Sequence, residues 1–230
     1  MRINKYISET GYCSRRETVR LIQAGRIIVN GELCKPNHDV EPGDIVLIDG
    51  KSIPLKEEPI YIALNKPRGI TSTAAKHIEG NIIDFVNHPK RIFPVGRLDK
   101  DSEGLILLTN DGEIVNKILR SEHDHEKEYL VKVDKPFSDT FLKGISGGVD
   151  ILVGKTEPCR VARISDDEFQ IILTQGLNRQ IRRMCRVFGY TVIRLERVRI
   201  MNVKLDGLDV GQWRDLAKEE LNELKNLLLI

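Results

Sequence analysis

Short apolar runs separated by turn signals predict two helices at the start of the chain. Residues 3–9 predict a short helix that stops near Gly11. Ser14 and Glu17 stand in capping-box spacing, so the Ser14 hydroxyl can accept from the first-turn amides of a second helix that ends at Gly25. The apolar side of this second helix is expected to hold Val19, Leu21 and Ile22.

Turn chemistry marks the segments that follow. Asn30-Gly31 separates two apolar runs, which is the strongest short signal for a β-hairpin, and a further strand is predicted at 45–48. Residues 51–59 hold two prolines and four charges around little apolar content, and we interpret them as a semi-stiff linker. The chain is therefore expected to form a small domain at 1–50 and a larger one at 60–230.

The most informative stretch of the larger domain runs from Gly96 to Gly112. It begins as a loop rich in charge and continues as Leu105 to Leu108, an apolar run of the length of a buried strand. Local composition alone favours a solvated surface loop before this strand over a catalytic loop on a rigid support. The choice between the two needs more than the local pattern.

Apolar periodicity predicts the other elements of this domain. Strands are expected at 60–64, 127–133, 159–164, 169–173 and 191–200, and helices at 82–86, 113–120, 137–145 and after the turn at 176–178. The residues expected to face inward from the helix at 113–120 are Ile114, Ile118 and Leu119. The last helix carries a core-facing stripe of Ile181, Met184, Cys185 and Phe188. On the strand at 127–133, Tyr129 shares a face with Val131 and Val133, which is more typical of core than of function.

The composition is that of an ordinary globular protein. Of the 230 residues, 40% are hydrophobic and 30% are charged, and no run is long and apolar enough to span a membrane. The polar N-terminus lacks the apolar core of a signal peptide, so we expect a cytoplasmic protein. The four cysteines have no metal-binding spacing and are expected to be buried thiols: Cys13, Cys34, Cys159 and Cys185.

Positive charge gathers in two places although the net charge is only +2. Arg16 and Arg20 share a face of the second helix. From Arg179 to Arg199 there are seven arginines and one acid, Glu196, which a simple salt-bridged surface does not explain. This excess predicts an anionic partner, and RNA is the best candidate.

The sequence offers no sign of a cofactor or a metal. It has neither a phosphate-binding loop nor a dinucleotide fingerprint, so a nucleotide cofactor is not expected. His123-Asp124-His125 is not followed by the cysteines or histidines that would complete a tetrahedral metal site.

The N-terminal segment resembles an S4 RNA-binding domain in three runs, 2–7, 13–16 and 25–31. The resemblance implies that the helix face around Arg15, Arg16 and Arg20 grips phosphates of folded RNA. Lys66 and Arg68, in a basic turn at 65–69, either contact RNA backbone or belong to an ordinary surface turn. The residues assigned to RNA binding are Arg2, Lys5, Arg15, Arg16, Arg20, Lys66, Arg179, Arg183 and Arg186.

The rest of the chain resembles the RsuA-like family of ribosomal RNA pseudouridine synthases. Three blocks carry the resemblance, 64–69, 96–112 and 176–184, and the runs 125–131, 195–203 and 213–216 look closest to the RluF branch. The implied fold is α+β: a small S4 domain is followed along the chain by a domain with a mixed, largely antiparallel sheet. A deep central cleft is expected to cross this sheet, with Asp99 at its floor. The implied catalytic residue is Asp99, although spacing alone does not exclude Asp101 or Glu103. The implied uridine pocket consists of Arg97, Tyr129, Arg182 and Leu195, with Arg182 paired to the aspartate and keeping it ionised.

The resemblance implies an isomerase that converts a uridine of ribosomal RNA, most simply of the 23S large-subunit RNA, to pseudouridine without a cofactor. The base is expected to leave its stack, with Tyr129 stacking on it and Arg97 filling its place or holding a phosphate. Which uridine reacts, whether transfer RNA is a second substrate, and whether Asp99 attacks base or sugar stay open. A monomer is expected. The alternatives are a non-catalytic RNA-binding or ribosome-assembly factor and an RNA glycosidase.

Overall fold

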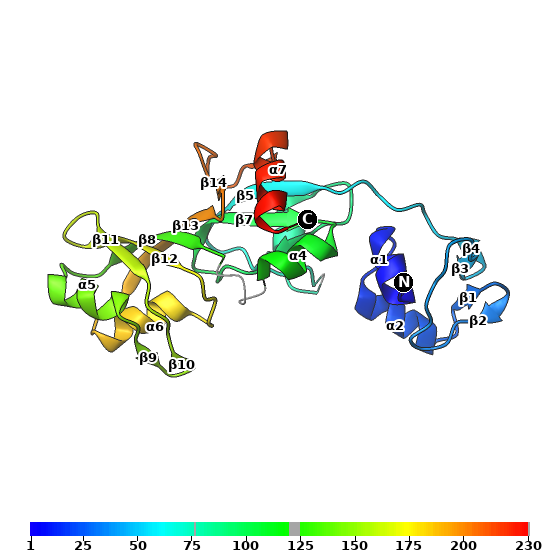
Figure 1. Cartoon of the computed structure of the whole chain (residues 1–230), viewed down its shortest axis with the longest axis horizontal. Coiled ribbons are helices and arrows are strands. Elements are labelled where there is room, and N and C mark those ends of the chain that lie inside the picture. The colour runs from blue at the N-terminus through cyan, green and yellow to red at the C-terminus, as the bar shows by residue number, and fades with distance from the viewer. Residues whose placement is uncertain (76, 120–124, 230) are drawn as a thin grey trace. The chain divides into compact units, whose positions relative to one another are not determined.

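The computed structural model describes residues 1–75, 77–119 and 125–229, which form two compact units (Figure 1). One unit consists of Met1–Ile60 with the short segments Pro89–Arg91 and Asn110–Gly112. The other comprises the remaining described residues. Each unit is considered by itself below.

The first unit is a pair of helices against a small antiparallel sheet. Its helices are α1 (Ile3–Glu9) and α2 (Arg15–Gln23), and its strands, in the sheet order β2-β1-β3-β4, are β1 (Ile27–Val29), β2 (Glu32–Leu33), β3 (Val46–Ile48) and β4 (Lys51–Ser52). The predicted cap is present, since Ser14 Oγ accepts from Glu17 N at 3.1 Å. The predicted hairpin is also present, with Asn30 and Gly31 both at positive φ as a tight turn requires.

Two predictions for this unit need correction. Lys51 and Ser52 pair with β3, so the segment interpreted as a linker begins inside the sheet. Val19 is 41% exposed, whereas Thr18 is fully buried. The helix turns Thr18, Leu21 and Ile22 inward at i, i+3 and i+4 spacing, which points Val19 away from the core.

The second unit is built on a mixed, largely antiparallel nine-stranded sheet, which confirms the expected fold class. The main path runs β11-β12-β8-β13-β7-β5-β15, with β14 paired to β13 and β6 paired to β7. Its strands are β5 (Tyr61–Lys66), β6 (Phe93–Val95), β7 (Glu103–Thr109), β8 (Lys127–Val133), β11 (Arg160–Arg163), β12 (Glu168–Leu173), β13 (Val192–Ile200), β14 (Val203–Lys204) and β15 (Trp213–Asp215).

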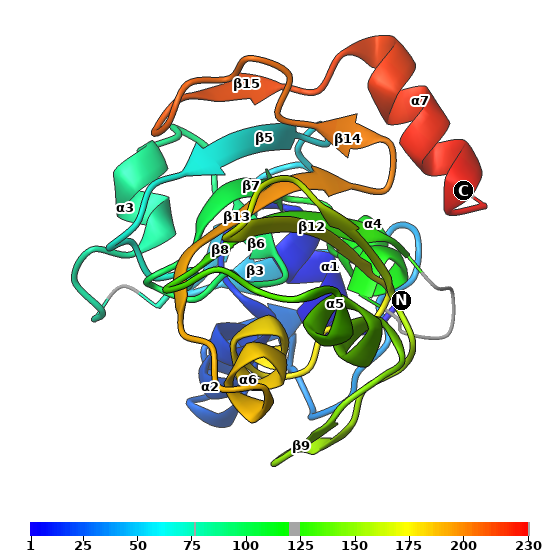
Figure 2. The same ribbon diagram turned by 90° about the vertical axis from the view of Figure 1, so that its left-hand side faces the viewer.

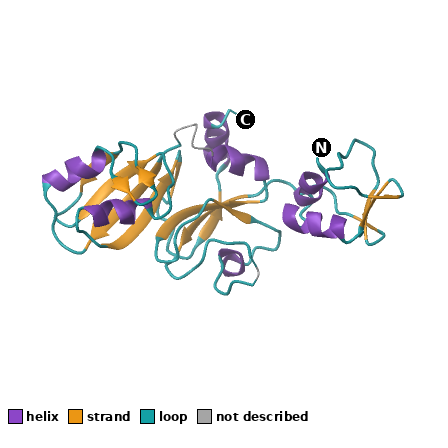
Figure 3. Ribbon diagram, turned by 90° about the horizontal axis from the view of Figure 1, so that it is seen from below, coloured by secondary structure: helices purple, strands orange, loops and turns teal. Residues whose placement is uncertain are grey.

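Helices cover this sheet at two places (Figures 2 and 3). The helices are α3 (Ile82–Val86), α4 (Gly112–Leu119), α5 (Asp139–Ser146), α6 (Gln180–Val187) and α7 (Lys218–Leu227), and a small hairpin of β9 (Asp150–Ile151) and β10 (Gly154–Lys155) lies beside α6. Phe141 of α5 and Met184 of α6 pack with β8, β12 and β13 in one buried core. Ile118 of α4 and Leu224 of α7 pack with β5 and β7 in a second.

The central strand β7 is buried almost along its whole length, as its apolar run predicts. One of its edges pairs with β5 and the other is shared by two strands: β13 pairs in parallel at Glu103 and Gly104, and β6 pairs antiparallel from Leu107 to Thr109. The loop that connects the end of β6 to the start of β7 therefore lies near the place where this edge changes partner from β6 to β13. Asp99 lies in this connection.

The helix α4 corrects one further prediction. Ile114 and Ile118 are buried as expected, but Leu119 is 48% exposed. Leu119 follows Ile118 by one residue, or about 100° around the helix, and this turn takes it past the edge of the buried face that Ile114 and Ile118 define. Among the described residues, no helix has the length and apolar content to cross a bilayer.

Candidate active site

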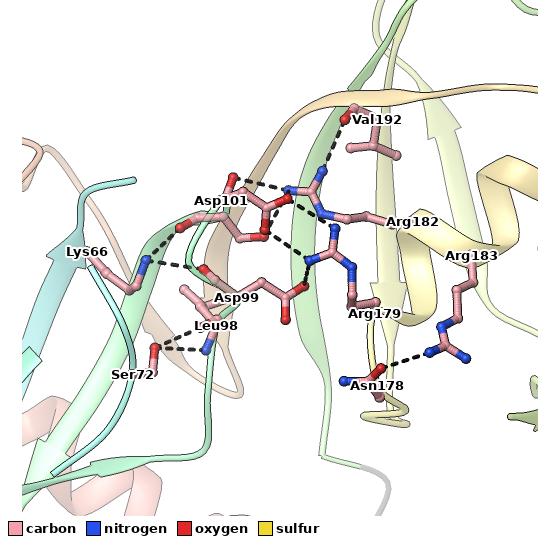
Figure 4. Close-up of polar contacts among 11 residues, drawn as sticks. Lys66, Ser72, Leu98, Asp99, Asp101, Asn178, Arg179, Arg182, Arg183 and Val192 are labelled. Carbon is pink, nitrogen blue, oxygen red and sulfur yellow. Dashed lines mark hydrogen bonds and ion pairs between the residues drawn. The ribbon is translucent and has the colours of Figure 1, made fainter. Parts of the chain in front are cut away.

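Backbone contacts hold the loop around Asp99 against the rest of the unit. Ser72 Oγ donates to Leu98 O at 2.8 Å and accepts from Leu98 N at 3.2 Å. Gly69 N donates to Lys100 O at 2.7 Å, and Ser102 N closes a turn on Asp99 O at 3.0 Å. The loop is therefore fixed on both sides of Asp99, and the side chain starts from a defined position (Figure 4).

Lys66 also anchors this loop, through hydrogen bonds from its side chain to backbone oxygens. Its side chain is fully buried, and Nζ donates to Ser102 O at 2.8 Å, Pro67 O at 3.0 Å and Asp99 O at 3.3 Å. Burial lowers the pKa of this amine from 10.5 to about 8. The prediction that Lys66 contacts RNA is wrong, because no part of its side chain reaches the surface.

This buried lysine predicts a pH-dependent contribution to stability. The folded protein releases the Lys66 proton at a pKa of about 8 and the unfolded chain at 10.5, so the unfolded chain binds more protons between these values. The free energy of unfolding therefore gains a Lys66 contribution that rises with pH, by about 2 kcal/mol between pH 8 and 10. We expect Lys66→Met to lack this rise in denaturant titrations at the two pH values.

The matched control is Lys218→Met, since Lys218 is exposed on α7. Its difference from the parent protein should stay constant with pH. If the difference in the free energy of unfolding between Lys66→Met and the parent also stays constant with pH, the pKa of Lys66 is not depressed.

The side chains of Asp99 and Asp101 meet that of Arg179 beside this loop, as Figure 4 shows. Arg179 lays its guanidinium on Asp101, with Nη1 to Oδ1 at 3.2 Å and Nη2 to Oδ2 at 3.1 Å, and its Nη1 lies 3.4 Å from Asp99 Oδ2. The hydrogen bonds from Arg179 hold the pKa of Asp101 below its ordinary value, and the same bonds raise the pKa of Arg179. Asp99 itself is about one-third exposed, with a side-chain accessibility of 31%.

Arg182 takes a different place from the one implied by the family resemblance. Its closest carboxylate is Asp101, with Nη2 3.5 Å from Oδ2, and the ion pair of Asp99 is made by Arg179. Arg182 also donates to Asp101 O and Ser102 Oγ at 3.1 Å each and to Val192 O at 3.0 Å. It joins the loop to β13 and is nearly buried, and burial lowers its pKa.

The remaining residues of the predicted uridine pocket lie on two sides of this cluster. Tyr129 on β8 is paired with Arg197 of β13, which in turn is paired with Gly104 of β7, so one strand separates Tyr129 from the end of the Asp99 loop. Tyr129 is half-buried and packs against the core that includes Leu195. Arg97 is exposed, and its side chain makes no hydrogen bond or ion pair within the described residues.

The structure lowers the number of uncompensated arginines at 179–199, on which the expectation of an RNA partner partly rested. The fold brings acids from other strands to several of these arginines: Glu103 and Glu196 to Arg194, and Glu126 and Glu128 to Arg199. Arg197 is buried and donates to Leu105 O at 2.7 Å. Arg186 is exposed without such a partner in the described chain, and Arg183 donates to Asn178 Oδ1 at 2.9 Å.

The basic residues of the first unit also divide into two groups. Arg2 lies 3.6 Å from Asp39, Lys5 lies 3.7 Å from Glu9, and Arg20 lies 3.1 Å from Glu17. Arg15 and Arg16 are exposed at the start of α2 and make no side-chain hydrogen bond or ion pair with any described residue.

Sequence reasoning missed the anchoring residues of the Asp99 loop. Ser72 and Ser102 gave no signal, because a single serine is common in any loop. Lys66 could have been found from the apolar strand that leads into it, which continues two residues further than predicted. The expectation of a deep cleft with Asp99 at its floor stays a prediction, since the open hollows of about 570 and 620 Å³ are lined by other residues, including His125 and Asn202 in one and Asn65 and Glu196 in the other.

The rejected metal motif lies partly outside the described residues, at His123 and Asp124. His125 is buried, and its Nε2 lies 3.1 Å from Lys117 O. No group of three potential metal ligands converges anywhere in the described ranges.

Comparison with known proteins gives consistent matches. Residues 60–186 match the family described as RNA pseudouridylate synthase, and residues 1–46 match the S4 domain family. The dual-specificity RNA pseudouridine synthases RluF of Shigella flexneri and Escherichia coli strain K12 are each 55% identical, over 99% of this chain and 79% of the relative.

Two less similar proteins match this chain over nearly their whole length. The ribosomal large subunit pseudouridine synthase B of Bacillus subtilis is 35% identical over 98% of this chain and 96% of the relative. A crystal structure described as a pseudouridylate synthase is similar over 97% of this chain and 99% of its own, with a TM-score of 0.72 and 27% identity.

Proposed function

The chain belongs to the RsuA-like family of RNA pseudouridine synthases and carries an S4 domain, and on that premise we propose that it isomerises a uridine of 23S ribosomal RNA with Asp99 as the catalytic carboxylate. The reaction breaks the bond between uracil N1 and ribose C1′, turns the base and joins C5 to C1′. N1 gains a proton and C5 loses one, so atoms and electrons balance within the nucleotide.

The observation that carries the assignment of Asp99 is its position on an anchored loop with one oxygen available. Its Oδ2 is the oxygen nearest to Arg179, while Oδ1 accepts no hydrogen bond from any described residue. A carboxylate that attacks the nucleotide, or that stabilises positive charge on the sugar, needs such an accessible oxygen. Asp101 and Glu103, by contrast, each accept a hydrogen bond from an arginine, at 3.1 and 2.6 Å.

Tyr129 and Arg97 have proposed roles on the substrate. Tyr129 presents a flat ring one strand away from the loop and supports the detached uracil by stacking. Arg97 is exposed next to the loop and fills the space that the flipped base leaves, or holds a phosphate.

The substrate is tested with three RNAs labelled with tritium at uridine C5, since loss of the C5 proton releases the label. We expect release from large-subunit ribosomal RNA and none from small-subunit RNA. A transfer RNA arm decides whether this chain has a second substrate. Release from small-subunit RNA alone would overturn the proposed substrate, and an abasic product would identify a glycosidase instead.

Arg15 and Arg16 are the proposed phosphate contacts of the S4 domain, because they are exposed and without a partner acid in the described chain. We expect the double variant Arg15→Gln/Arg16→Gln to bind RNA more weakly. The slope of log affinity against log salt should fall by about 1.5, since each phosphate contact contributes roughly 0.7–0.9. Filter binding at several salt concentrations measures both effects.

The control for this prediction replaces two exposed lysines of the same unit, Lys35→Gln/Lys51→Gln. It removes the same charge away from α2, so its salt slope should change much less. Equal slopes for the two double variants would mean that net charge, and not the α2 face, binds the RNA.

A further inference from the structure

We propose that Asp101 is a positioning residue that holds the guanidinium of Arg179 off the catalytic carboxylate of Asp99. The inference rests on the proposed catalytic role of Asp99. It assigns Asp101 a function that neither the family match nor the names of the relatives describe.

The contact pattern shows which carboxylate Arg179 prefers. Both terminal nitrogens of Arg179 meet the two oxygens of Asp101, at 3.2 and 3.1 Å, in the two-point geometry that suits a guanidinium best. Its closest approach to Asp99 is longer, 3.4 Å from Nη1 to Oδ2, and Arg179 makes no hydrogen bond to this carboxylate (Figure 4). Asp101 therefore takes the stronger interaction, and Asp99 keeps Oδ1 available.

Asp101 is held where it can do this. Arg182 donates to its backbone oxygen at 3.1 Å and lies 3.5 Å from its Oδ2. Arg182 is itself fixed by Ser102 Oγ and Val192 O, and its side chain is only 10% exposed. Loss of the Asp101 charge would therefore leave Arg182 in place.

Arg179 is held at its backbone but not at its side chain. It stands before α6 with φ of +51°, and the next residue, Gln180, is buried and accepts from Leu177 N at 3.1 Å. The guanidinium, by contrast, belongs to a side chain that is 42% exposed. Without Asp101 the residue stays at this position, and its guanidinium turns to the nearest remaining carboxylate, which is Asp99.

A two-point pair with Arg179 would occupy both oxygens of Asp99. A carboxylate bound in this way is less able to approach the ribose or base, because its lone pairs are engaged and its position is drawn toward the cation. Asp101 thus acts through Arg179 and touches no reacting atom.

The test measures single-turnover rates at saturating RNA for a set of variants. We expect Asp101→Asn to lower the rate about 10- to 100-fold, the size of a misplaced catalytic group, with RNA affinity nearly unchanged. Asp101→Asn/Arg179→Gln should be faster than Asp101→Asn, because the competing cation is gone. If Asp101 has only a structural role, adding Arg179→Gln to Asp101→Asn should lower the rate further.

Three controls keep the outcome interpretable. Asp139→Asn removes the charge from another aspartate that pairs with an arginine, Arg163 at 2.9 Å, and should leave the rate unchanged. Asp101→Glu keeps the charge and should exceed Asp101→Asn in rate, which gives a test if the amide variant does not fold. Circular dichroism and melting confirm folding of each variant.

A parent-like rate for Asp101→Asn, or a double variant no faster than Asp101→Asn, would overturn the proposal. The proposed function fails by a separate result, which is full activity of Asp99→Asn. The two failures are therefore distinguishable in the same assay.

Discussion

Replacing Asp99 by Asn is expected to lower the single-turnover rate of pseudouridine formation by at least about 10⁴-fold, the scale on which loss of a central catalytic group acts. The amide has the shape of the carboxylate but no negative charge for the developing positive charge on the sugar. RNA affinity should change little, because Asp99 is negatively charged and does not bind phosphate. Tritium release and filter binding measure the two quantities separately.

Asp139→Asn serves as the matched control, since it makes the same chemical change on α5 and should keep the parent rate. A modest loss in Asp99→Asn, of tenfold or less, would assign the chemistry to another group. Asp101 and Glu103 would then be the next carboxylates to test, because both lie within the same loop and strand start.

Gly104→Ala is expected to destabilise the second unit by at least about 3 kcal/mol. Gly104 has φ of +101°, and a Cβ at this position would lie 2.3 Å from Arg197 O and 2.6 Å from Arg197 N. Both atoms are backbone of β13, so relief requires β7 and β13 to separate where they pair in parallel. Differential scanning calorimetry should show the unfolding transition falling by about 6–12 °C.

Gly43→Ala separates the steric clash from the cost of the left-handed backbone. Gly43 has a similar φ of +99°, but a Cβ there meets no atom within 4 Å. It should cost about 1 kcal/mol, the usual cost of alanine at positive φ. Equal losses for Gly43→Ala and Gly104→Ala would mean that the close approach of β7 and β13 does not require glycine.

Local signals predicted the elements of the fold with good accuracy. The helix α1, the short helix α3 and the strand β8 have the predicted bounds, because apolar spacing and turn residues act over a few neighbouring positions. The errors at Val19 and Leu119 share one cause. Both residues were predicted to face inward because they are apolar. The position of a residue around the helix decides whether the core covers it.

Charges were harder to predict, because their partners come from distant parts of the chain. Two of the arginines at 179–199 have partners on other strands: Arg194 pairs with Glu103 of β7, and Arg199 pairs with Glu128 of β8. The same effect hid the role of Lys66, whose partners are carbonyls of a loop more than thirty residues away. Counting charge along the sequence cannot detect such pairs.

The candidate site was only partly predicted, again because charged partners come from distant parts of the chain. The family resemblance pointed to Asp99, and the fold brings Arg182 to its loop, but the ion pair of Asp99 is made by Arg179. Which of two arginines three residues apart on a helix start meets a given acid depends on backbone angles. The positive φ of Arg179 is one such angle, and it could not be predicted from the presence of an arginine at this position.

The most direct test of the central claim is nucleoside analysis of large-subunit RNA after incubation with the parent protein or with Asp99→Asn. We predict that the parent converts a uridine into its C5-linked isomer, with the RNA chain intact and no base released, and that Asp99→Asn leaves the uridine unchanged. Formation of the isomer by Asp99→Asn at the parent rate would contradict the account.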